Sequence, residues 1–318
     1  MYTIDKRETA VINGQKYDLR IRGADESNPV LLYLHGGPGG TDRGIALEYL
    51  KSLASICTLV FWDQRGVGKA FKLLDAFRAK PTVDVYIEDT HHVMCYLKKR
   101  FNQEKIYVLG HSFGTKLGVL AAVKYPEDFA AYIGTGQCTN MFQEVLSYDF
   151  TMEEALKRSD QKTLRVLKKI GRPVNGEYRR EADIGRQRKI CGKYGGIVHK
   201  KGIGFFEAAE LMLKEYSLFE YFIKNQIGGF HVANALEKPF REIDLFKIAK
   251  KVDIPIYIFE GRHDYCCPFA SVEEWFSALQ ASYKELVWFE HSGHMPMLEE
   301  HDLYLKTIAG RVFKQSGF

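Results

Sequence analysis

A serine between two glycines is the first feature of this sequence that can do chemistry. Ser112 lies in the sequence Gly-His-Ser-Phe-Gly at positions 110–114, directly after an apolar run at 106–109 and directly before a helical pattern at 114–125. At such a strand-to-helix turn, small flanking residues prevent collisions with the neighbouring strand and helix, and the serine hydroxyl is exposed at the tip. This context predicts that Ser112 is a nucleophile and not an ordinary turn serine.

Backbone N–H groups near Ser112 are predicted to stabilise the oxyanion that forms when a hydroxyl attacks a carbonyl group. One donor is the N–H of Phe113, the residue after the nucleophile. The second donor is expected in the sequence His-Gly-Gly-Pro-Gly-Gly at 35–40, where a glycine backbone can approach substrate without a Cβ in the way. Gly37 is the first candidate and Gly36 the next. A phosphate-binding loop is excluded here, because the segment lacks a lysine followed by serine or threonine.

An alkyl hydroxyl becomes a useful nucleophile only when an adjacent base removes its proton. Two histidines, His291 and His294, follow the last apolar run of the chain at 285–289. We expect His291 to belong to the end of a strand and His294 to lie in the loop beyond it, where its ring can reach the nucleophile. His294 is therefore the predicted general base.

The base in turn needs an acidic partner that holds its ring in the productive tautomer. Glu260 and Asp264 both follow the apolar run at 254–259. Asp264 lies deeper in the loop and has the greater reach, so it is the predicted partner of His294. The chain order serine, acid, histidine is typical of a nucleophile in this kind of turn.

Alternating short apolar runs and helical patterns indicate how these loops are positioned. A hairpin is expected at Asn13-Gly14, because this dipeptide favours a tight turn between strands. The later runs, separated by helical patterns, predict an α/β fold with a mostly parallel sheet and helices on both faces. The expected strands lie at 29–34, 57–62, 106–109, 129–133, 254–259 and 285–289, and the expected helices at 83–101, 114–125, 272–279 and 299–313.

Residues 138–245 differ from the rest of the chain, because they contain amphipathic helical stretches and no convincing buried strand. Breaks in these helices are expected at 171–173, 195–196 and 228–229, where glycine or proline occurs. A segment of this length is too long for a structureless loop. We therefore predict a core domain formed by residues 1–137 and 246–318, with residues 138–245 inserted as a helical cap, or lid, over the carboxyl edge of the sheet.

Composition excludes several other classes of protein. The chain of 318 residues is 46% hydrophobic and 27% charged, as expected for a globular protein. The net charge of +5 includes a basic region at 157–201, but apolar residues interrupt it at helical spacing, which favours a solvated helix surface over a nucleic-acid site. No run approaches the roughly 20 apolar residues of a membrane span. Residues 1–9 do not resemble a signal peptide, so we expect a cytoplasmic protein.

The six cysteines show no paired short spacing of a zinc site, and no cofactor or metal is predicted. Reduced thiols are expected in the cytoplasm. The adjacent pair Cys266-Cys267 is compatible with a redox-sensitive or arsenical-sensitive site, but the favoured interpretation is that of two small residues packed near a loop.

Five motifs together resemble the proline iminopeptidase branch of the α/β-hydrolases. They are His-Gly-Gly-Pro-Gly-Gly at 35–40, Asp-Gln-Arg-Gly-Val-Gly at 63–68, the serine turn at 110–114, Gly-Arg-His-Asp at 261–264 and Ser-Gly-His at 292–294. The resemblance implies an α/β-hydrolase fold and the release of an N-terminal residue, often proline, from a short peptide. It also implies a largely structural role for the second motif, in which we expect an ion pair between Asp63 and Arg65.

The same resemblance implies that carboxylates of the cap hold the free amine of the substrate. The candidates lie in the acidic half of the predicted cap, and for each of them an exposed position on a helix is the alternative. They are Glu207, Glu210, Glu215 and Glu220.

Three functions remain open from the sequence. The first is an aminopeptidase that acts on small peptides through an acyl-enzyme, and the second is a carboxylesterase of small esters with the same triad. The third is a non-catalytic α/β-hydrolase-fold protein that binds a small molecule. The expected partner is thus a small molecule or short peptide and neither a nucleic acid nor a membrane, and the oligomeric state stays open.

Overall fold

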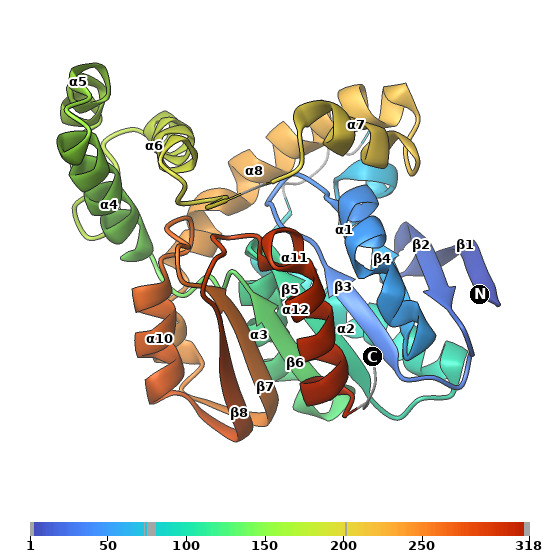
Figure 1. Cartoon of the computed structure of the whole chain (residues 1–318). Helices are drawn as coiled ribbons and strands as arrows, with labels where there is room; N and C mark the ends of the chain where they lie inside the picture. Colours follow the sequence, from blue (N-terminus) through green and yellow to red (C-terminus); the bar gives the residue numbers. More distant parts are fainter. Residues whose placement is uncertain (1–2, 73, 75–80, 201, 315–318) are drawn as a thin grey trace.

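A single sheet forms the centre of the computed structural model, which describes residues 3–72, 74, 81–200 and 202–314 (Figure 1). Among these residues, eight strands pair in the order β1-β2-β4-β3-β5-β6-β7-β8. Strand β2 is antiparallel to β1 and β4, and the other neighbours are parallel. The mostly parallel sheet predicted from the sequence is therefore confirmed. The strands are β1 (Ile4–Ile12), β2 (Gln15–Gly23), β3 (Val30–Leu34), β4 (Thr58–Trp62), β5 (Ile106–His111), β6 (Phe129–Thr135), β7 (Lys251–Gly261) and β8 (Gln280–Phe289).

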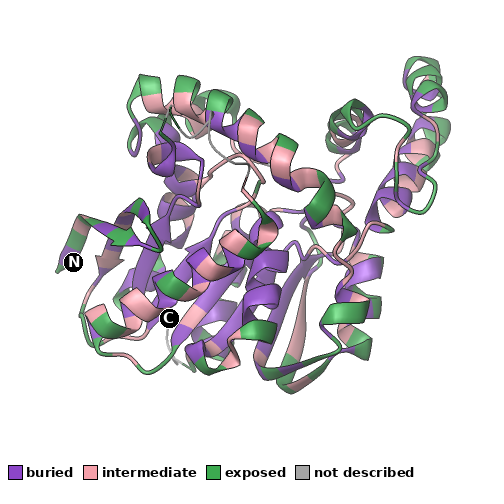
Figure 2. Ribbon diagram, turned by 180° about the vertical axis from the view of Figure 1, so that it is seen from behind, coloured by how far each residue is buried: buried purple, intermediate pink, exposed green. Residues whose placement is uncertain are grey.

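Helices cover both faces of this sheet, as predicted. One hydrophobic cluster joins the strands to Leu97 of α2, Leu117 of α3 and Trp275 of α10. A second cluster on the opposite face includes Leu47 of α1 and Tyr304 of α12. Figure 2 shows the strands as largely buried between helices whose outer faces are exposed. The core helices are α1 (Arg43–Leu50), α2 (Val83–Phe101), α3 (Phe113–Lys124), α9 (Leu245–Ile248), α10 (Phe269–Ala278), α11 (Pro296–Glu299) and α12 (His301–Thr307).

The segment between β6 and β7 is helical, and we refer to residues 138–245 as the cap. Its helices α4, α5 and α6 stand away from the sheet and share a small apolar core that includes Tyr148, Leu164 and Leu167 (Figure 1). Among the described helices of the whole chain, none combines the length and the hydropathy that a membrane crossing requires. The cap helices are α4 (Gln143–Lys157), α5 (Gln161–Ile170), α6 (Ala182–Lys193), α7 (Phe205–Leu213) and α8 (Asn225–Glu242), with a π-helical turn η5 (Phe219–Lys224) before α8.

The helix break predicted at Gly228-Gly229 is wrong, because both residues lie inside α8. Their glycine character has a tertiary cause. A Cβ at Gly228 would lie 2.4 Å from the carbonyl oxygen of Gly66, and one at Gly229 would lie 2.1 Å from that of Gly39. The two glycines therefore allow the backbone of α8 to pack directly on two loops of the core, one of which contains the predicted oxyanion glycines.

The substitution Gly229→Ala tests this close contact. The added methyl group cannot fit without moving α8 away from Gly39, so we expect the free energy of unfolding to fall by about 1–3 kcal/mol. The matched control is Gly185→Ala in α6, where no atom lies within 4 Å of the new Cβ. The control should raise the free energy of unfolding by about 0.5–1 kcal/mol, the ordinary gain for glycine to alanine in a helix. Urea denaturation of both variants measures the difference, and equal stabilisation of both would contradict the contact.

Candidate active site

Ser112 occupies a tight turn between β5 and α3, with φ of +53° and ψ of −119°. A residue other than glycine rarely adopts a positive φ, and such strain often occurs at functional sites. The turn is close to β3, because a Cβ at Gly114 would lie 2.1 Å from the carbonyl oxygen of Leu34. The Ser112 amide donates a hydrogen bond of 3.0 Å to the carbonyl oxygen of Thr135 at the end of β6. The half-buried serine is thus held at the carboxyl edge of the sheet.

His294 and Asp264 form a buried pair in the loops that follow β8 and β7. Nδ1 of His294 donates to Oδ2 of Asp264 at 2.7 Å, and the two residues are 4% and 0% exposed. The other carboxylate oxygen of Asp264 accepts the backbone N–H groups of Cys266 and Cys267, each at 2.8 Å. Both oxygens of Asp264 are therefore used, and Nε2 is the nitrogen of His294 that stays available for a substrate or a nucleophile.

The alternative residues weighed from the sequence are placed differently. His291 was expected at the end of a strand, and this is wrong because β8 ends at Phe289. The exposed side chain of His291 lies in the turn that follows. Glu260 is fully buried, and its carboxylate accepts the backbone N–H of Gln137 at 3.2 Å. Burial, and then the nearby Asp264 carboxylate, raise the pKa of Glu260 well above its usual value. The geometry joins Asp264 and not Glu260 to His294.

The loops of Ser112 and His294 meet at the same edge of the sheet. The rings of His294 and His111, the residue before Ser112, are 5.0 Å apart between their centroids. Gly136 follows the residue that holds the Ser112 amide, and a Cβ at Gly136 would lie 2.6 Å from Nδ1 of His294. Among the described residues no hydrogen bond joins the Ser112 hydroxyl to His294. Such contacts are often loose before substrate binds and tighten afterwards.

The electrostatic environment of His294 favours its protonated form. Burial on its own would lower the pKa of His294, but the Asp264 carboxylate, followed by Cys266, raises the pKa well above its usual value. A positive charge that develops on the ring is therefore stabilised by the carboxylate behind it. This is the property that a base needs when it takes a proton during a reaction.

The glycine-rich loop predicted to supply an oxyanion donor lies beside the serine. A Cβ at Gly36 would lie 3.4 Å from the Cβ of Ser112, and the Phe113 amide is at the start of α3. A buried glutamine fixes the loop: the backbone N–H of Gln64 donates to Nε2 of His35 at 2.9 Å, and its side chain donates to the His35 carbonyl at 3.0 Å. The structure thus places Gly36, the alternative candidate, against Ser112, and Gly37 follows it in the same loop.

A second histidine–carboxylate contact near the serine was not predicted from the sequence. Nδ1 of His111 lies 3.3 Å from Oδ2 of Asp42, and its Nε2 lies 3.2 Å from the carbonyl oxygen of His294. Tyr33 also donates to Asp42, at 2.9 Å. His111 therefore links the loop before α1, the serine turn and the His294 loop. No sequence spacing indicated this link, because the three segments are far apart in the chain.

The cap contributes backbone contacts to the loops of the site. The carbonyl oxygen of Ile197 accepts the N–H of His294 at 2.7 Å, and that of Gly196 accepts the N–H groups of Tyr265 and Cys266 at 2.9 and 3.0 Å. This short stretch of the cap thus lies between the Asp264 loop and the His294 loop and holds both of them.

Glu215 and Glu220, two of the predicted amine ligands, are paired with cations of the core. Glu215 is 8% exposed and lies 3.0, 3.4 and 3.5 Å from the guanidinium groups of Arg7, Arg20 and Arg43. Glu220 pairs with Lys69 at 2.8 Å. These contacts neutralise both carboxylates and attach the cap to the core.

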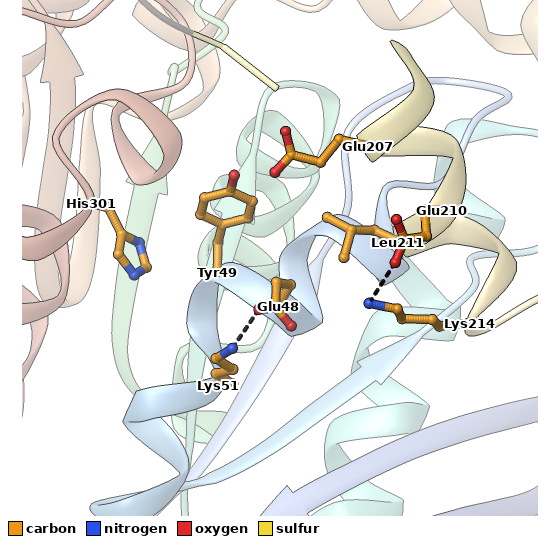
Figure 3. Close-up of a pocket in the computed structure, with 8 residues that line it drawn as sticks. All are labelled: Glu48, Tyr49, Lys51, Glu207, Glu210, Leu211, Lys214 and His301. Atoms are coloured by element: carbon orange, nitrogen blue, oxygen red, sulfur yellow. Dashed lines mark hydrogen bonds and ion pairs between the residues drawn. The ribbon is translucent and has the colours of Figure 1, made fainter. Parts of the chain in front are cut away.

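Glu207 and Glu210 lie on α7 and line a surface pocket with Tyr49 of α1 and His301 of α12 (Figure 3). Glu210 pairs with Lys214 at 3.4 Å. None of Ser112, Asp264 and His294 is among the residues that line this pocket. The structure therefore does not bring the four predicted glutamates to the serine turn as one group.

The ion pair expected between Asp63 and Arg65 is wrong. Arg65 forms a bidentate pair with Asp89 of α2, with both distances 2.7 Å. Asp63 is buried near Arg43, at 3.6 Å, and accepts the hydroxyl of Thr41 at 3.0 Å. The chain turns after β4, so each side chain meets partners from other elements instead of its neighbour two positions away.

Glu144 of the cap, which was not singled out from the sequence, is linked to the Asp264 loop by the side chain of Arg188. Arg188 donates to the carbonyl oxygen of Cys266 and to Oε1 of Glu144, both at 2.6 Å. Glu144 is 3% exposed, and its Oε2 has no hydrogen-bond partner among the described residues. Burial is the main cause that raises the pKa of Glu144 above its usual value. The sequence around Glu144 gave no sign that its carboxylate would be buried and linked to the Asp264 loop.

Together, the sheet order, the serine turn and the Asp264–His294 pair define a hydrolase fold, and comparison agrees. The chain belongs to the α/β-hydrolase family. The model of this family, described as alpha/beta hydrolase fold, matches residues 29–301. Proteins named proline iminopeptidase, the branch that the sequence motifs resemble, are among the relatives of this chain.

Two relatives and one solved structure illustrate this placement. The probable aminopeptidase YbaC of Bacillus subtilis is 27% identical over 305 residues, which cover 94% of this chain and 93% of the relative. A proline iminopeptidase of Saccharolobus solfataricus is 26% identical and is matched over 91% of this chain and 85% of its own length. The crystal structure of a proline iminopeptidase of Mycobacterium smegmatis shares the fold, with a TM-score of 0.66, 16% identity and coverage of 97% and 98%. The relatives support a hydrolase.

The substitution Asp264→Asn tests the electrostatic coupling in the site. It removes the carboxylate that raises the pKa of His294 and leaves the burial that lowers it, so the pKa of His294 should fall. Nuclear magnetic resonance of ring-labelled histidine measures this titration. The matched control is Asp253→Asn, which changes an exposed aspartate of β7 paired with Lys251 and should leave the His294 titration in place. If the pKa of His294 is the same in Asp264→Asn as in wild type, a group other than the Asp264 carboxylate raises it.

Proposed function

We propose that this protein is a serine hydrolase in which Ser112 attacks a substrate carbonyl, His294 takes the hydroxyl proton and Asp264 holds the histidine. The observation that supports this most is the buried 2.7 Å hydrogen bond from Nδ1 of His294 to Asp264, beside a strained serine turn. The bond fixes the tautomer in which Nε2 is a base. The raised pKa of His294 further stabilises the ring once it has accepted the proton.

The reaction then proceeds through an acyl-enzyme. The backbone N–H groups of Phe113 and Gly37, with Gly36 as the alternative second donor, stabilise the oxyanion of the tetrahedral intermediate. His294 returns its proton to the leaving group, and the acyl group stays on Ser112. A water molecule, activated by the same histidine, hydrolyses this ester and restores the serine.

The substrates that we propose are small peptides or amino-acid amides, from which the enzyme releases the N-terminal residue in the cytoplasm. The aminopeptidase and proline iminopeptidase relatives support this specificity. Glu144 supports it too, because a buried carboxylate oxygen without a partner suits a protonated amine. The six free thiols are in keeping with a reducing compartment.

A carboxylesterase that acts on small esters is the second candidate function. It is favoured by the pairing of the cap carboxylates with cations, since Glu215, Glu220 and one oxygen of Glu144 are already engaged by core or cap residues. Carboxylates paired in this way are not available to an amine, so amine recognition depends on the free oxygen of Glu144. The two candidates share the same nucleophile and base.

Parallel assays of prolyl and alanyl arylamides and of simple aryl esters separate these functions. We expect turnover of the arylamides, and a loss of roughly 1,000-fold or more in kcat in Ser112→Ala, because members of a triad act as a unit. Turnover of esters alone would support the carboxylesterase. Absence of turnover in both assays would instead support a non-catalytic binding protein.

The same assays examine amine recognition. Glu144→Gln should raise KM for the arylamides by roughly tenfold, the cost of one charge-assisted hydrogen bond, and leave KM for the esters in place. The matched control is Glu210→Gln, whose exposed side chain lies in the separate pocket of Figure 3. Equal effects of Glu144→Gln on both substrate types would contradict a role in amine binding.

A further inference from the structure

Two thiol groups lie near the ring of His294, and a third lies beside one of them. Cys266 and Cys267 follow Asp264 after β7, and Cys138 follows β6. The ligand atoms of Cys266, Cys267 and His294 all lie within 4.8 Å of one another. Sγ of Cys138 lies 3.3 Å from Sγ of Cys267. All three cysteines are free, and Cys266 and Cys138 are only half-buried. The proposed hydrolase chemistry uses none of these thiols.

The backbone holds these thiols in place on both sides. Oδ1 of Asp264 accepts the amides of Cys266 and Cys267, so the loop of the cysteine pair cannot move independently of the carboxylate. On the other side, the amide of Cys138 donates to the hydroxyl of Thr115 at 2.9 Å, and its carbonyl accepts the side chain of Gln137 at 2.8 Å. The cluster is therefore organised before any ligand arrives.

Three sulfurs and one imidazole are the donor set of a soft divalent cation. Zinc binds thiolates at about 2.3 Å and imidazole at about 2.0–2.1 Å, usually with four ligands in a tetrahedron. Two sulfurs on one such ion lie about 3.8 Å apart, close to the spacing between Cys138 and Cys267. The ligand atoms of Cys266, Cys267 and His294 lie within 4.8 Å of one another, and Cys138 joins this group through its contact with Cys267.

The partner of His294 is also the one that metal-binding histidines require. A ligating histidine usually donates its other ring N–H to a carboxylate, which orients the ring and makes it a better ligand. Nδ1 of His294 makes this bond to Asp264 at 2.7 Å, so we expect the cation to bind Nε2. In the proposed reaction, Nε2 is the nitrogen that takes the proton from Ser112.

We propose that Cys138, Cys266, Cys267 and His294 form a binding site for a soft divalent cation such as Zn²⁺, and that the bound cation inhibits the enzyme. Inhibition follows because the cation occupies the Nε2 lone pair and leaves no base for Ser112. This inhibition rests on the proposed function, whereas binding of the cation does not.

A second group of possible metal ligands among the described residues is less suited to a soft cation. His91, Cys95 and Asp128 also lie close together, but Lys98 donates to Asp128 at 2.7 Å. An ammonium group therefore already neutralises this carboxylate, and the group contains one thiol. Cys95→Ser is accordingly a matched control for the loss of a thiol outside the proposed site.

Direct binding tests the site without reference to activity. The whole chain, kept reduced with a phosphine, is titrated with Cd²⁺ alone as a spectroscopic substitute for Zn²⁺, and the ultraviolet thiolate-to-metal absorption is followed. Zn²⁺ alone is measured separately by equilibrium dialysis with elemental analysis. We expect one ion per chain in wild type, in Cys95→Ser and in Ser112→Ala. Affinity should fall by about tenfold or more in Cys138→Ser, Cys266→Ser and Cys267→Ser. Equal binding in these three variants and in wild type would overturn the site.

Inhibition is measured on the same preparations. Zn²⁺ should abolish turnover of the best substrate, and a chelator should restore it. For each variant, turnover is expressed relative to its own zinc-free rate. The zinc concentration that halves turnover should be about tenfold or more higher in Cys267→Ser than in wild type, and should be the same in Cys95→Ser as in wild type. Stoichiometric binding at this site with undiminished turnover would overturn the inhibition and leave the proposed hydrolase intact. If no substrate is turned over at all, the proposed function fails, and the binding measurement still decides the site.

Discussion

The carboxylate of Asp264 lies in a fully buried position, and its hydrogen bonds are the constraint on which the rest of the site depends. An unpaired carboxylate in such a place would be very costly, so each oxygen must find donors. Oδ2 accepts from His294, and Oδ1 accepts from the amides of Cys266 and Cys267. The orientation of the imidazole and the positions of two thiols are consequently set by the same group. The parallel sheet makes this possible, because the loops after β7 and β8 emerge at the edge where Ser112 also lies.

The cap is attached to the core through buried polar contacts, and these contacts also shape the site. Backbone groups of Ile197 hold the His294 loop, while Glu215 is surrounded by arginines of the core. At the end of α8, Lys116 of the core donates to the carbonyl oxygens of Phe240 and Ile243, both at 3.0 Å. Burial lowers the pKa of Lys116 to about 8. The cap therefore helps to position loops of the site through these contacts.

Local rules predicted what depends on local sequence, and they failed where a distant partner decides. The hairpin at Asn13-Gly14 and the strand–serine–helix turn follow from neighbouring residues, and the structure contains both. The pair at Gly228-Gly229 was wrongly predicted as a break, because the carbonyls that require glycine come from other loops. The partner of Arg65 was missed for the same reason, since Asp89 lies on a separate helix. The grouping of Cys138 with Cys267, 129 positions away, has no counterpart in sequence spacing.

The most direct test of the account is covalent labelling of the serine with a fluorophosphonate, followed by mass analysis of the peptides. We expect one adduct per chain, on Ser112, and a rate of labelling that falls by roughly 1,000-fold in His294→Ala, because the hydroxyl then has no base. An adduct on another residue, or equally fast labelling in wild type and His294→Ala, would contradict the proposed partnership of the hydroxyl and the imidazole.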